Sequence, residues 1–145
     1  MWLEIEKVAR AKGQRDQKTW DLTPEPVTEY EMRLCVFDCA NIPTMDMEGT
    51  SDVYIKAFLD EHIKKTTDTH YRSMNGKPSF SYRMLFDVEM PRLDKSLTLQ
   101  AWDRDMFKSN EFICEWTLDL SVLFKTVQMS GSSVHLSKTY YEKVL

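Results

Sequence analysis

The 145-residue chain has 19 lysine and arginine residues against 23 aspartate and glutamate residues, which gives a formal net charge of −4. Its length fits one domain, and 42% hydrophobic residues with only four glycines and five prolines exclude a low-complexity or disordered chain. A pI near 5.4 argues against a general nucleic-acid-binding protein, which needs a basic face. No stretch reaches the roughly 18–20 apolar residues of a membrane span, so we expect a soluble domain without a targeting segment.

Alternation of apolar and polar residues is the dominant pattern along the chain. It is the period of a half-buried β-strand, in which every second side chain faces the core. The clear examples are Tyr30–Val36, Val53–Leu59, Phe80–Val88, Leu97–Ala101 and Phe112–Leu118. Shorter or weaker examples are Trp2–Val8, Thr66–Arg72 and Ser133–Ser137. The sequence therefore predicts an all-β fold, an eight-stranded antiparallel β-sandwich.

Two segments depart from this alternation. Ala9–Thr28 is polar, carries two prolines and holds Trp20 in isolation, which predicts an extended connection that the tryptophan pins to the sandwich. We divide the single domain into residues 1–28, an N-terminal strand with this connection, and residues 29–145, the sandwich body. Apolar residues at intervals of three and four predict short helical turns near residues 118–127.

The chain has three cysteines, an odd number. Cys35 and Cys39 are four residues apart, too far for a disulfide if the segment is extended. We expect reduced thiols, as in a cytosolic protein.

Five acidic residues fall in two segments that are far apart in the sequence. Asp46 and Asp52 flank a turn between two predicted strands, Asp103 and Asp105 directly follow another strand, and Glu111 starts the next one. Because the loops of a sandwich gather at its two ends, these carboxylates can converge. Two like charges about 4 Å apart cost about 4 kcal/mol at an effective dielectric constant near 20. We therefore predict a strongly acidic end that a cation balances, and oxygen ligands suit Ca²⁺ best.

Four motifs of the chain resemble those of a known family. N-I-P-x-M-D-x-x-G-T-S-D-V-Y-I-K (Asn41–Lys56) and L-x-L-Q-A-W-D-R-D-x-x-x-S-N-E-F-I (Leu97–Ile113) are similar to the two Ca²⁺ loops of a C2 domain. W-D-L-T-P-E-P-x-x-E-Y-E-x-R (Trp20–Arg33) and T-D-T-H-Y-R-x-x-x-G-K-x-S-F-x-Y-R (Thr67–Arg83) resemble the ferlin family in particular. The likeness covers about residues 20–125.

The resemblance implies one module of a large, tail-anchored ferlin-like protein with several C2 domains. Ferlins act in Ca²⁺-triggered membrane fusion and repair, so it implies vesicle fusion, exocytosis or membrane repair at the cytoplasmic face of a vesicle or of the plasma membrane. The family's Ca²⁺ ligands match Asp46 and Asp52 in the first loop and Asp103 and Asp105 in the third. Glu111 stands where a fifth aspartate is usual, and Cys114 where glycine is usual; both departures bear on the number and affinity of bound ions. An EF-hand interpretation of Asp103–Cys114 fails, because Lys108 stands where the motif needs glycine.

Apolar residues stand at the tips of the two acidic loops. They are Met45 and Met47 in the first loop and Met106 and Phe107 in the third. Burying such a side chain yields about 1.5–3 kcal/mol, so we predict that these residues insert into the membrane. The alternative is that they pack on neighbouring loops.

Basic residues could add attraction for lipid headgroups at about 1 kcal/mol each. The candidates are Lys56, Lys64, Lys65, His70, Arg72 and Lys108. C2 domains that bind phosphoinositides usually place lysines on the fourth strand, where this chain has Thr67 and Thr69. A solvated basic edge is therefore the competing interpretation.

Three function classes remain to be compared. The first is a Ca²⁺-dependent electrostatic switch that binds an anionic phospholipid membrane, with fusion-machinery proteins or neighbouring C2 domains as further partners and the isolated module a monomer. The second is a Ca²⁺-independent protein-interaction module. The third, an enzyme, is not expected, because Asp103 and Asp105 lie on one predicted loop without a cleft or a glycine-rich phosphate loop. The three histidines have no metal-binding spacing.

Overall fold

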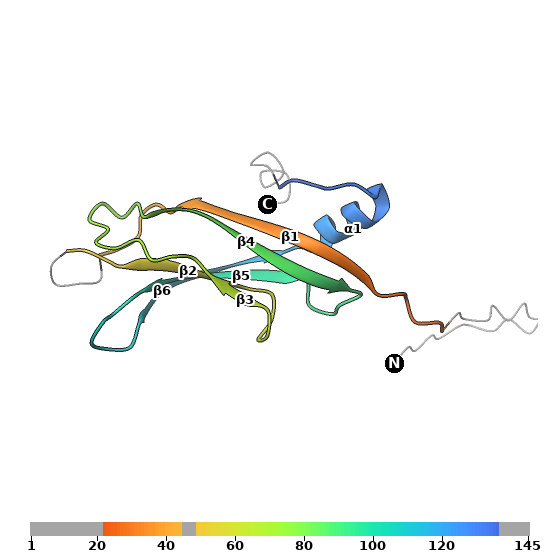
Figure 1. The fold of residues 1–145 in the computed structure, drawn as a ribbon, viewed down its shortest axis with the longest axis horizontal. Helices are drawn as coiled ribbons and strands as arrows, with labels where there is room; N and C mark the ends of the chain where they lie inside the picture. The colour runs from red at the N-terminus through yellow and green to blue at the C-terminus, as the bar shows by residue number, and fades with distance from the viewer. Residues whose placement is uncertain (1–21, 45–48, 137–145) are drawn as a thin grey trace, which may run out of the picture.

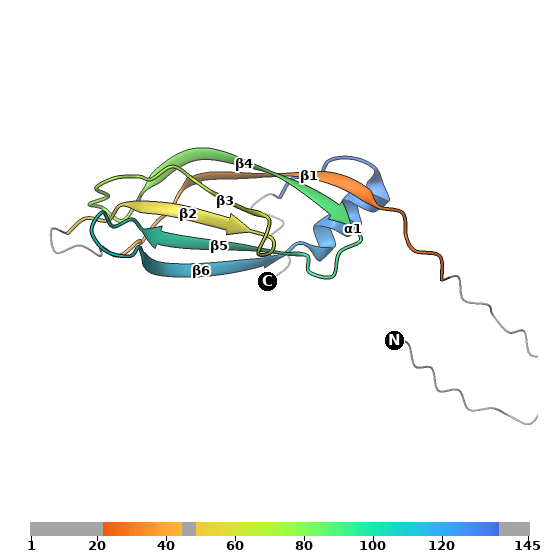
Figure 2. The same ribbon diagram turned by 60° about the horizontal axis from the view of Figure 1, so that its bottom comes forward.

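The computed structural model of the chain describes residues 22–44 and 49–136. Two antiparallel sheets lie face to face (Figures 1 and 2). One pairs β1 (Thr28–Asp38) with β4 (Ser79–Met90). The other has the order β3-β2-β5-β6 and consists of β3 (Lys64–Thr66), β2 (Val53–Phe58), β5 (Ser96–Asp103) and β6 (Glu111–Asp119). The predicted antiparallel β-sandwich is confirmed, with six strands among the described residues.

The alternation of the sequence explains which side of each sheet is buried. In β4 the side chains of Met84, Phe86 and Val88 are almost fully buried, whereas their neighbours along the strand are exposed. They pack between the two sheets against a group that includes Ala57, Leu59 and Leu97. A second, smaller cluster lies nearer the loops and consists of Ile42, Val53, Ile55 and Ala101. All five strands with a clear period-2 pattern are present.

Helix α1 (Ser121–Ser130) closes one end of the sandwich, where helical turns were expected near residues 118–127. Phe124 is its buried residue, and its ring meets that of Tyr30 edge to face at 5.9 Å. Gly131 ends the helix in the left-handed conformation, and its amide donates to the carbonyl of Val127. The described part of the chain has no helix long and apolar enough to span a membrane.

Three of the weaker strand predictions have different outcomes. Trp2–Val8 lies outside the described residues, as does Trp20. The strand predicted at Thr66–Arg72 is wrong over most of its length: only Lys64–Thr66 forms β3, and His70 makes a single bridge to Val53. The hydroxyl of Thr67 accepts a 2.9 Å hydrogen bond from the amide of Ile55, which replaces a backbone carbonyl and ends the ladder.

The predicted strand at Ser133–Ser137 is also wrong over its described part, because residues 133–136 have irregular backbone. Directly before this segment, the Ser130 hydroxyl bonds to the hydroxyl, the amide and the carbonyl of Ser132, and such local bonds compete with strand pairing. Leu22 and Val27, in the segment before β1, are exposed. The division of the domain at residues 28 and 29 stays a prediction. All three cysteines are free thiols.

Candidate functional site

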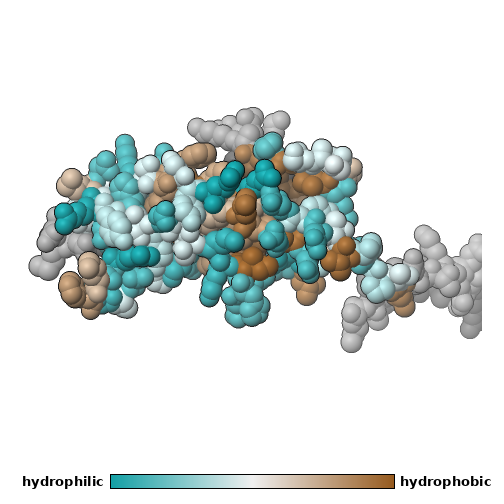
Figure 3. Space-filling model, viewed as in Figure 1, coloured by the Kyte–Doolittle hydropathy of each residue, from teal (hydrophilic) through white to brown (hydrophobic). Residues whose placement is uncertain are grey.

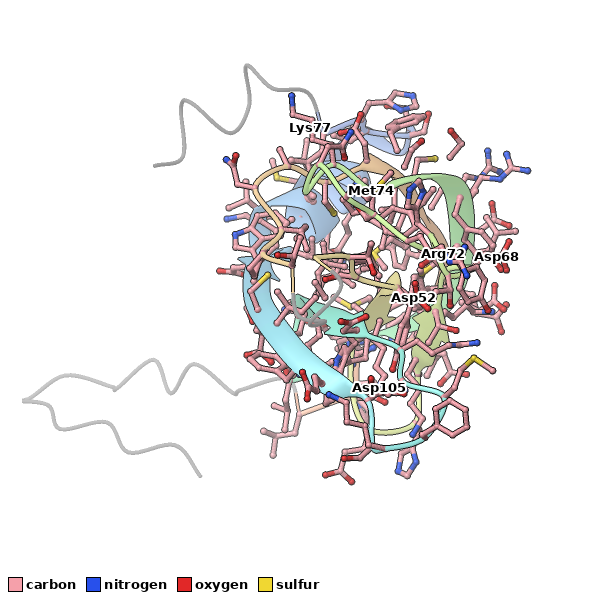
Figure 4. All side chains as sticks on the ribbon, turned by 90° about the vertical axis from the view of Figure 1, so that its left-hand side faces the viewer. Asp52, Asp68, Arg72, Met74, Lys77 and Asp105 are labelled. Atoms are coloured by element: carbon pink, nitrogen blue, oxygen red, sulfur yellow. The ribbon has the colours of Figure 1, made fainter. Side chains whose placement is uncertain are left out.

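Three loops meet at the end of the sandwich opposite helix α1 (Figures 1 and 4). They connect β1 to β2, β3 to β4 and β5 to β6. Backbone hydrogen bonds join them: Ser51 and Ser73 exchange two bonds of 2.9 and 3.2 Å, and the Arg104 amide donates to the Asp52 carbonyl at 2.8 Å. The predicted convergence of distant loops therefore occurs for the described residues.

Gly76 holds the middle loop against the first. Its φ of +63° favours glycine, and its carbonyl accepts a 3.0 Å bond from the amide of Ile42. A Cβ at this position would lie 2.6 Å from the carbonyl oxygen of Ile42. The close approach of the two loops therefore needs glycine here.

The backbone of Asp52 is joined to the side chain of Asp103. The Asp52 amide donates a 2.6 Å hydrogen bond to Oδ1 of Asp103, whose side chain is buried at the end of β5. Oδ1 of Asp52 in turn accepts a 2.7 Å bond from the amide of Arg72 in the middle loop. The two carboxylates therefore link all three loops.

Asp105 and Glu111 share one lysine. Nζ of Lys108 lies 2.5 Å from Oε1 of Glu111 and 3.6 Å from Oδ1 of Asp105. Hydrogen bonding to Glu111, and secondarily the charge of Asp105, raises the pKa of Lys108. The Asp105 side chain is only 11% exposed, and its Oδ2 is buried without a hydrogen-bond partner. An orphaned carboxylate oxygen is costly unless a hydrogen-bond donor or a cation meets it.

The structure brings four of the five predicted ligands to this end, and Asp46 lies outside the described residues. Within residues 22–44 and 49–136, no three or more His, Cys, Asp or Glu side chains are arranged to hold a metal ion. The ligand atoms available, including the orphaned Asp105 oxygen, are nevertheless carboxylate oxygens, the type of atom that a hard cation such as Ca²⁺ prefers.

The end that we predict to be strongly acidic also carries basic residues. Arg104 and Lys108 belong to the β5–β6 loop, as Asp105 does, and Arg72 and Lys77 belong to the neighbouring β3–β4 loop; Figure 4 shows labelled side chains of both signs at this end. The Arg104 guanidinium lies over the Tyr54 ring at 5.2 Å. The sequence lists these basic residues, but which of them contact the acids depends on the paths of the loops.

Apolar side chains protrude from the same loops. Met106 and Phe107 are 84% and 99% exposed, and hydrophobic side chains project over the β5–β6 loop in the space-filling view (Figure 3). Met45 and Met47 lie outside the described residues. Sequence analysis missed Met74 and Tyr71 of the middle loop, which are also exposed. The interruption of the strand pattern after Thr67 could have identified them.

The predicted basic residues do not form one patch. Strand register places Lys56 and Lys64 on one face of the four-stranded sheet and Lys65 on the other. Nδ1 of His70 lies 3.0 Å from the carbonyl oxygen and 3.2 Å from the amide nitrogen of Ser79, so this ring holds the start of β4. Arg72 belongs to the loop end, where its backbone meets Asp52.

Lys56 lies in an aromatic cluster that sequence analysis did not anticipate. Its ammonium is 3.8 Å from the centre of the Trp102 ring and 5.7 Å from that of Tyr54. The Tyr54 hydroxyl accepts a 2.8 Å hydrogen bond from Asn110, which connects the cluster to the β5–β6 loop. Cation–π contacts of this kind hold a lysine in place beside the loops.

Comparisons with known proteins agree with this architecture. Residues 30–135 match the model of the C2 domain family, and the chain belongs to that family. Its relatives among curated proteins are ferlins: Ferlin 2 of Tetrahymena thermophila is 32% identical over 114 residues, and Myoferlin of Xenopus tropicalis is 29% identical over 129 residues. These alignments cover 72% and 70% of this chain but only 7% of either relative.

Solved structures share the fold of this chain. A C2 domain of plant Extended Synaptotagmin 1 is 20% identical with a TM-score of 0.54, and the match covers 62% of this chain and 68% of that one. Human GIVD cytosolic phospholipase A2 matches with a TM-score of 0.53 at 15% identity, over 67% of this chain and only 14% of the enzyme. Likeness at this level of identity concerns the fold alone.

Proposed function

We propose that this chain is a Ca²⁺-dependent membrane-binding C2 module of a ferlin-like protein. The observation that carries the proposal is the buried, unpartnered Oδ2 of Asp105, on the loop that also exposes Met106 and Phe107. A cation bound to the Asp105 carboxylate would therefore lie close to Met106 and Phe107, whose side chains suit a lipid interface. The position of Asp52 and Asp103 beside this loop supports the same site.

Asp52, Asp103, Asp105 and Glu111 would hold the ion, together with Asp46 of the first loop. Bound Ca²⁺ supplies positive charge that cancels the carboxylates and attracts lipid phosphate. The chain itself orients the ligands: backbone amides fix one oxygen of Asp52 and one of Asp103. The remaining negative charge repels an anionic leaflet when no ion is bound.

The membrane contact combines apolar and basic side chains. Met106 and Phe107, with Met45 and Met47 of the first loop, would enter the headgroup region, and each buried side chain contributes about 1.5–3 kcal/mol. Met74 extends the same apolar surface from the middle loop. Lys56, Arg72 and Lys108 are the basic residues best placed to meet headgroups, since they lie at or beside the loops.

The ferlin relatives suggest a wider context for the module. In a tail-anchored, ferlin-like parent it would act on the cytoplasmic face of a vesicle or of the plasma membrane during fusion, exocytosis or repair. Neighbouring C2 domains or fusion-machinery proteins would be its protein partners. We assign it no catalytic role.

One observation favours a second candidate, a Ca²⁺-independent protein-interaction module. Lys108 already supplies a cation to Asp105 and Glu111, so part of the acidic end is balanced without metal. In that case the loops would present a mixed-charge surface to a protein, and Ca²⁺ would not change it.

Co-sedimentation with phosphatidylcholine–phosphatidylserine vesicles, in Ca²⁺ or in EDTA, tests the proposal. The wild type should pellet with vesicles in Ca²⁺ and stay in solution in EDTA. Asp105→Asn should abolish the difference, whereas Asp68→Asn, at an exposed position of the middle loop, should keep it. Equal pelleting of the wild type in both buffers would reject the switch and favour the interaction module.

A further inference from the structure

Lys108 occupies the position of a built-in counterion in the β5–β6 loop. Its ammonium lies between two predicted Ca²⁺ ligands, 2.5 Å from Oε1 of Glu111 and 3.6 Å from Oδ1 of Asp105. The Lys108 side chain is 55% exposed, so it can leave this position without unpacking any core residue. The contact therefore offsets part of the negative charge of the two acids.

The ammonium and a metal ion compete for these carboxylates. An ammonium has three donors and no acceptor, so it competes with Ca²⁺ for carboxylate lone pairs and repels the ion. Oδ2 of Asp105 is buried and has no hydrogen-bond partner, so this oxygen remains available as a ligand once the loop admits a cation. Full ligation by Asp105 and Glu111 requires that Lys108 move away.

The sequence determines where the released ammonium goes. Lys108 directly follows Met106 and Phe107, the exposed apolar residues of the loop. When these side chains enter a bilayer, the ammonium lies at the depth of the lipid phosphates. The negative partner that it loses to Ca²⁺ is thereby replaced by a phosphate.

We infer that Lys108 exchanges partners: it pairs with Asp105 and Glu111 in the Ca²⁺-free domain, and Ca²⁺ binding transfers it to an anionic lipid phosphate. This inference rests on the proposed function. It adds that one lysine lowers Ca²⁺ affinity in solution and raises membrane affinity once Ca²⁺ is bound.

Lys108→Met, which keeps the length of the side chain and removes its charge, separates these effects. Calorimetric titration with Ca²⁺ alone should show affinity about two- to fivefold tighter than in the wild type, because the competing pairs are lost. At saturating Ca²⁺, affinity for phosphatidylserine-containing vesicles should fall about fivefold. Lys125→Met, at an exposed position of helix α1, is the matched control and should change neither.

The two changes of opposite sign distinguish the exchange from simpler roles. A purely structural lysine would weaken both affinities, and a lysine that only contacts lipid would leave the Ca²⁺ affinity unchanged; either result overturns the inference. If the wild type binds Ca²⁺ and Lys108→Met binds it equally, only the inference fails. If neither protein gives heat with Ca²⁺, the proposed function fails as well.

Discussion

The backbone amide of Asp52 donates a 2.6 Å hydrogen bond to Oδ1 of Asp103, 51 residues further along the chain. This bond joins the start of β2 to the end of β5, where Val53 and Asp103 are paired in the strand ladder. Asp103 is therefore both a structural acceptor and a candidate Ca²⁺ ligand, and substitutions can separate the two roles.

Asp103→Ala removes the acceptor and leaves the Asp52 amide without this partner. We expect a loss of about 1–3 kcal/mol in the free energy of unfolding, measured by urea denaturation in EDTA. Asp103→Asn keeps a carbonyl oxygen that can accept the bond, so its stability should remain within about 1 kcal/mol of the wild type. Calorimetry should nevertheless show loss of Ca²⁺ binding for Asp103→Asn. Equal unfolding of Asp103→Ala and the wild type would contradict the structural role.

Gly76 should be the most sensitive glycine of the loops. Gly76→Ala combines an unfavourable positive φ with a clash against the Ile42 carbonyl, so we expect a loss of about 2–3 kcal/mol. Gly131→Ala has the same φ of +63° with nothing within 4 Å of the added Cβ, and should cost only about 1 kcal/mol. The difference between the two variants in urea denaturation measures the loop contact. Equal losses of unfolding free energy in the two variants would show that the loop shifts to remove the clash with Ile42.

Phe107→Ala should weaken Ca²⁺-dependent vesicle binding. The side chain is 99% exposed, and transferring such a ring into a lipid interface contributes about 1.5–3 kcal/mol, so affinity should fall at least about tenfold. Leu93→Ala is the control, because Leu93 is equally exposed in the connection between β4 and β5, at the other end of the sandwich (Figure 1). Vesicle co-sedimentation at fixed Ca²⁺ measures both. Parallel losses would mean that binding is not confined to the loop end.

Lys56 and Lys65 are two basic residues on opposite faces of the same sheet. If the aromatic cluster of Tyr54 and Trp102 presents Lys56 to headgroups, Lys56→Gln should lower affinity for anionic vesicles about fivefold. Lys65→Gln should have little effect, and neither variant should change Ca²⁺ affinity in solution. An equal loss from both would indicate only a general electrostatic attraction.

The lowered pKa of Asp60 should make the stability of the domain depend on pH. Backbone hydrogen bonds from Ile63 and His62, with a further contribution from Arg92, lower the pKa of its carboxyl below the ordinary value. A group whose folded pKa is depressed stabilises the fold above its unfolded pKa, and this contribution is lost as pH falls through the folded pKa. Asp60→Asn should therefore be less stable than the wild type at pH 7, and the difference should shrink below about pH 4. Urea denaturation across this range measures it, and a difference independent of pH would contradict the assignment.

The sequence predicted the strands with a clear alternation correctly and failed at a strand with a weaker pattern. The five clear strands were predictable because alternation is local: a strand places successive side chains on opposite faces, and the buried set of Met84, Phe86 and Val88 reads directly from the spacing. The strand predicted at Thr66–Arg72 failed because a single hydroxyl, that of Thr67, took the place of a backbone acceptor. No period in the sequence reports such a bond.

The sequence by itself determined the sandwich, since the period of apolar residues is a property of the chain, and it named the candidate oxygen ligands, which remain a prediction. Only the tertiary structure decided how the loops are joined, through Asp52 and Asp103, and that Arg72 meets Asp52 by its backbone rather than by its charge. It also decided that Lys108 balances Asp105 and Glu111, because those distances depend on the path of a loop. The net charge of −4 counts Lys108 and the acids without saying which of them are in contact.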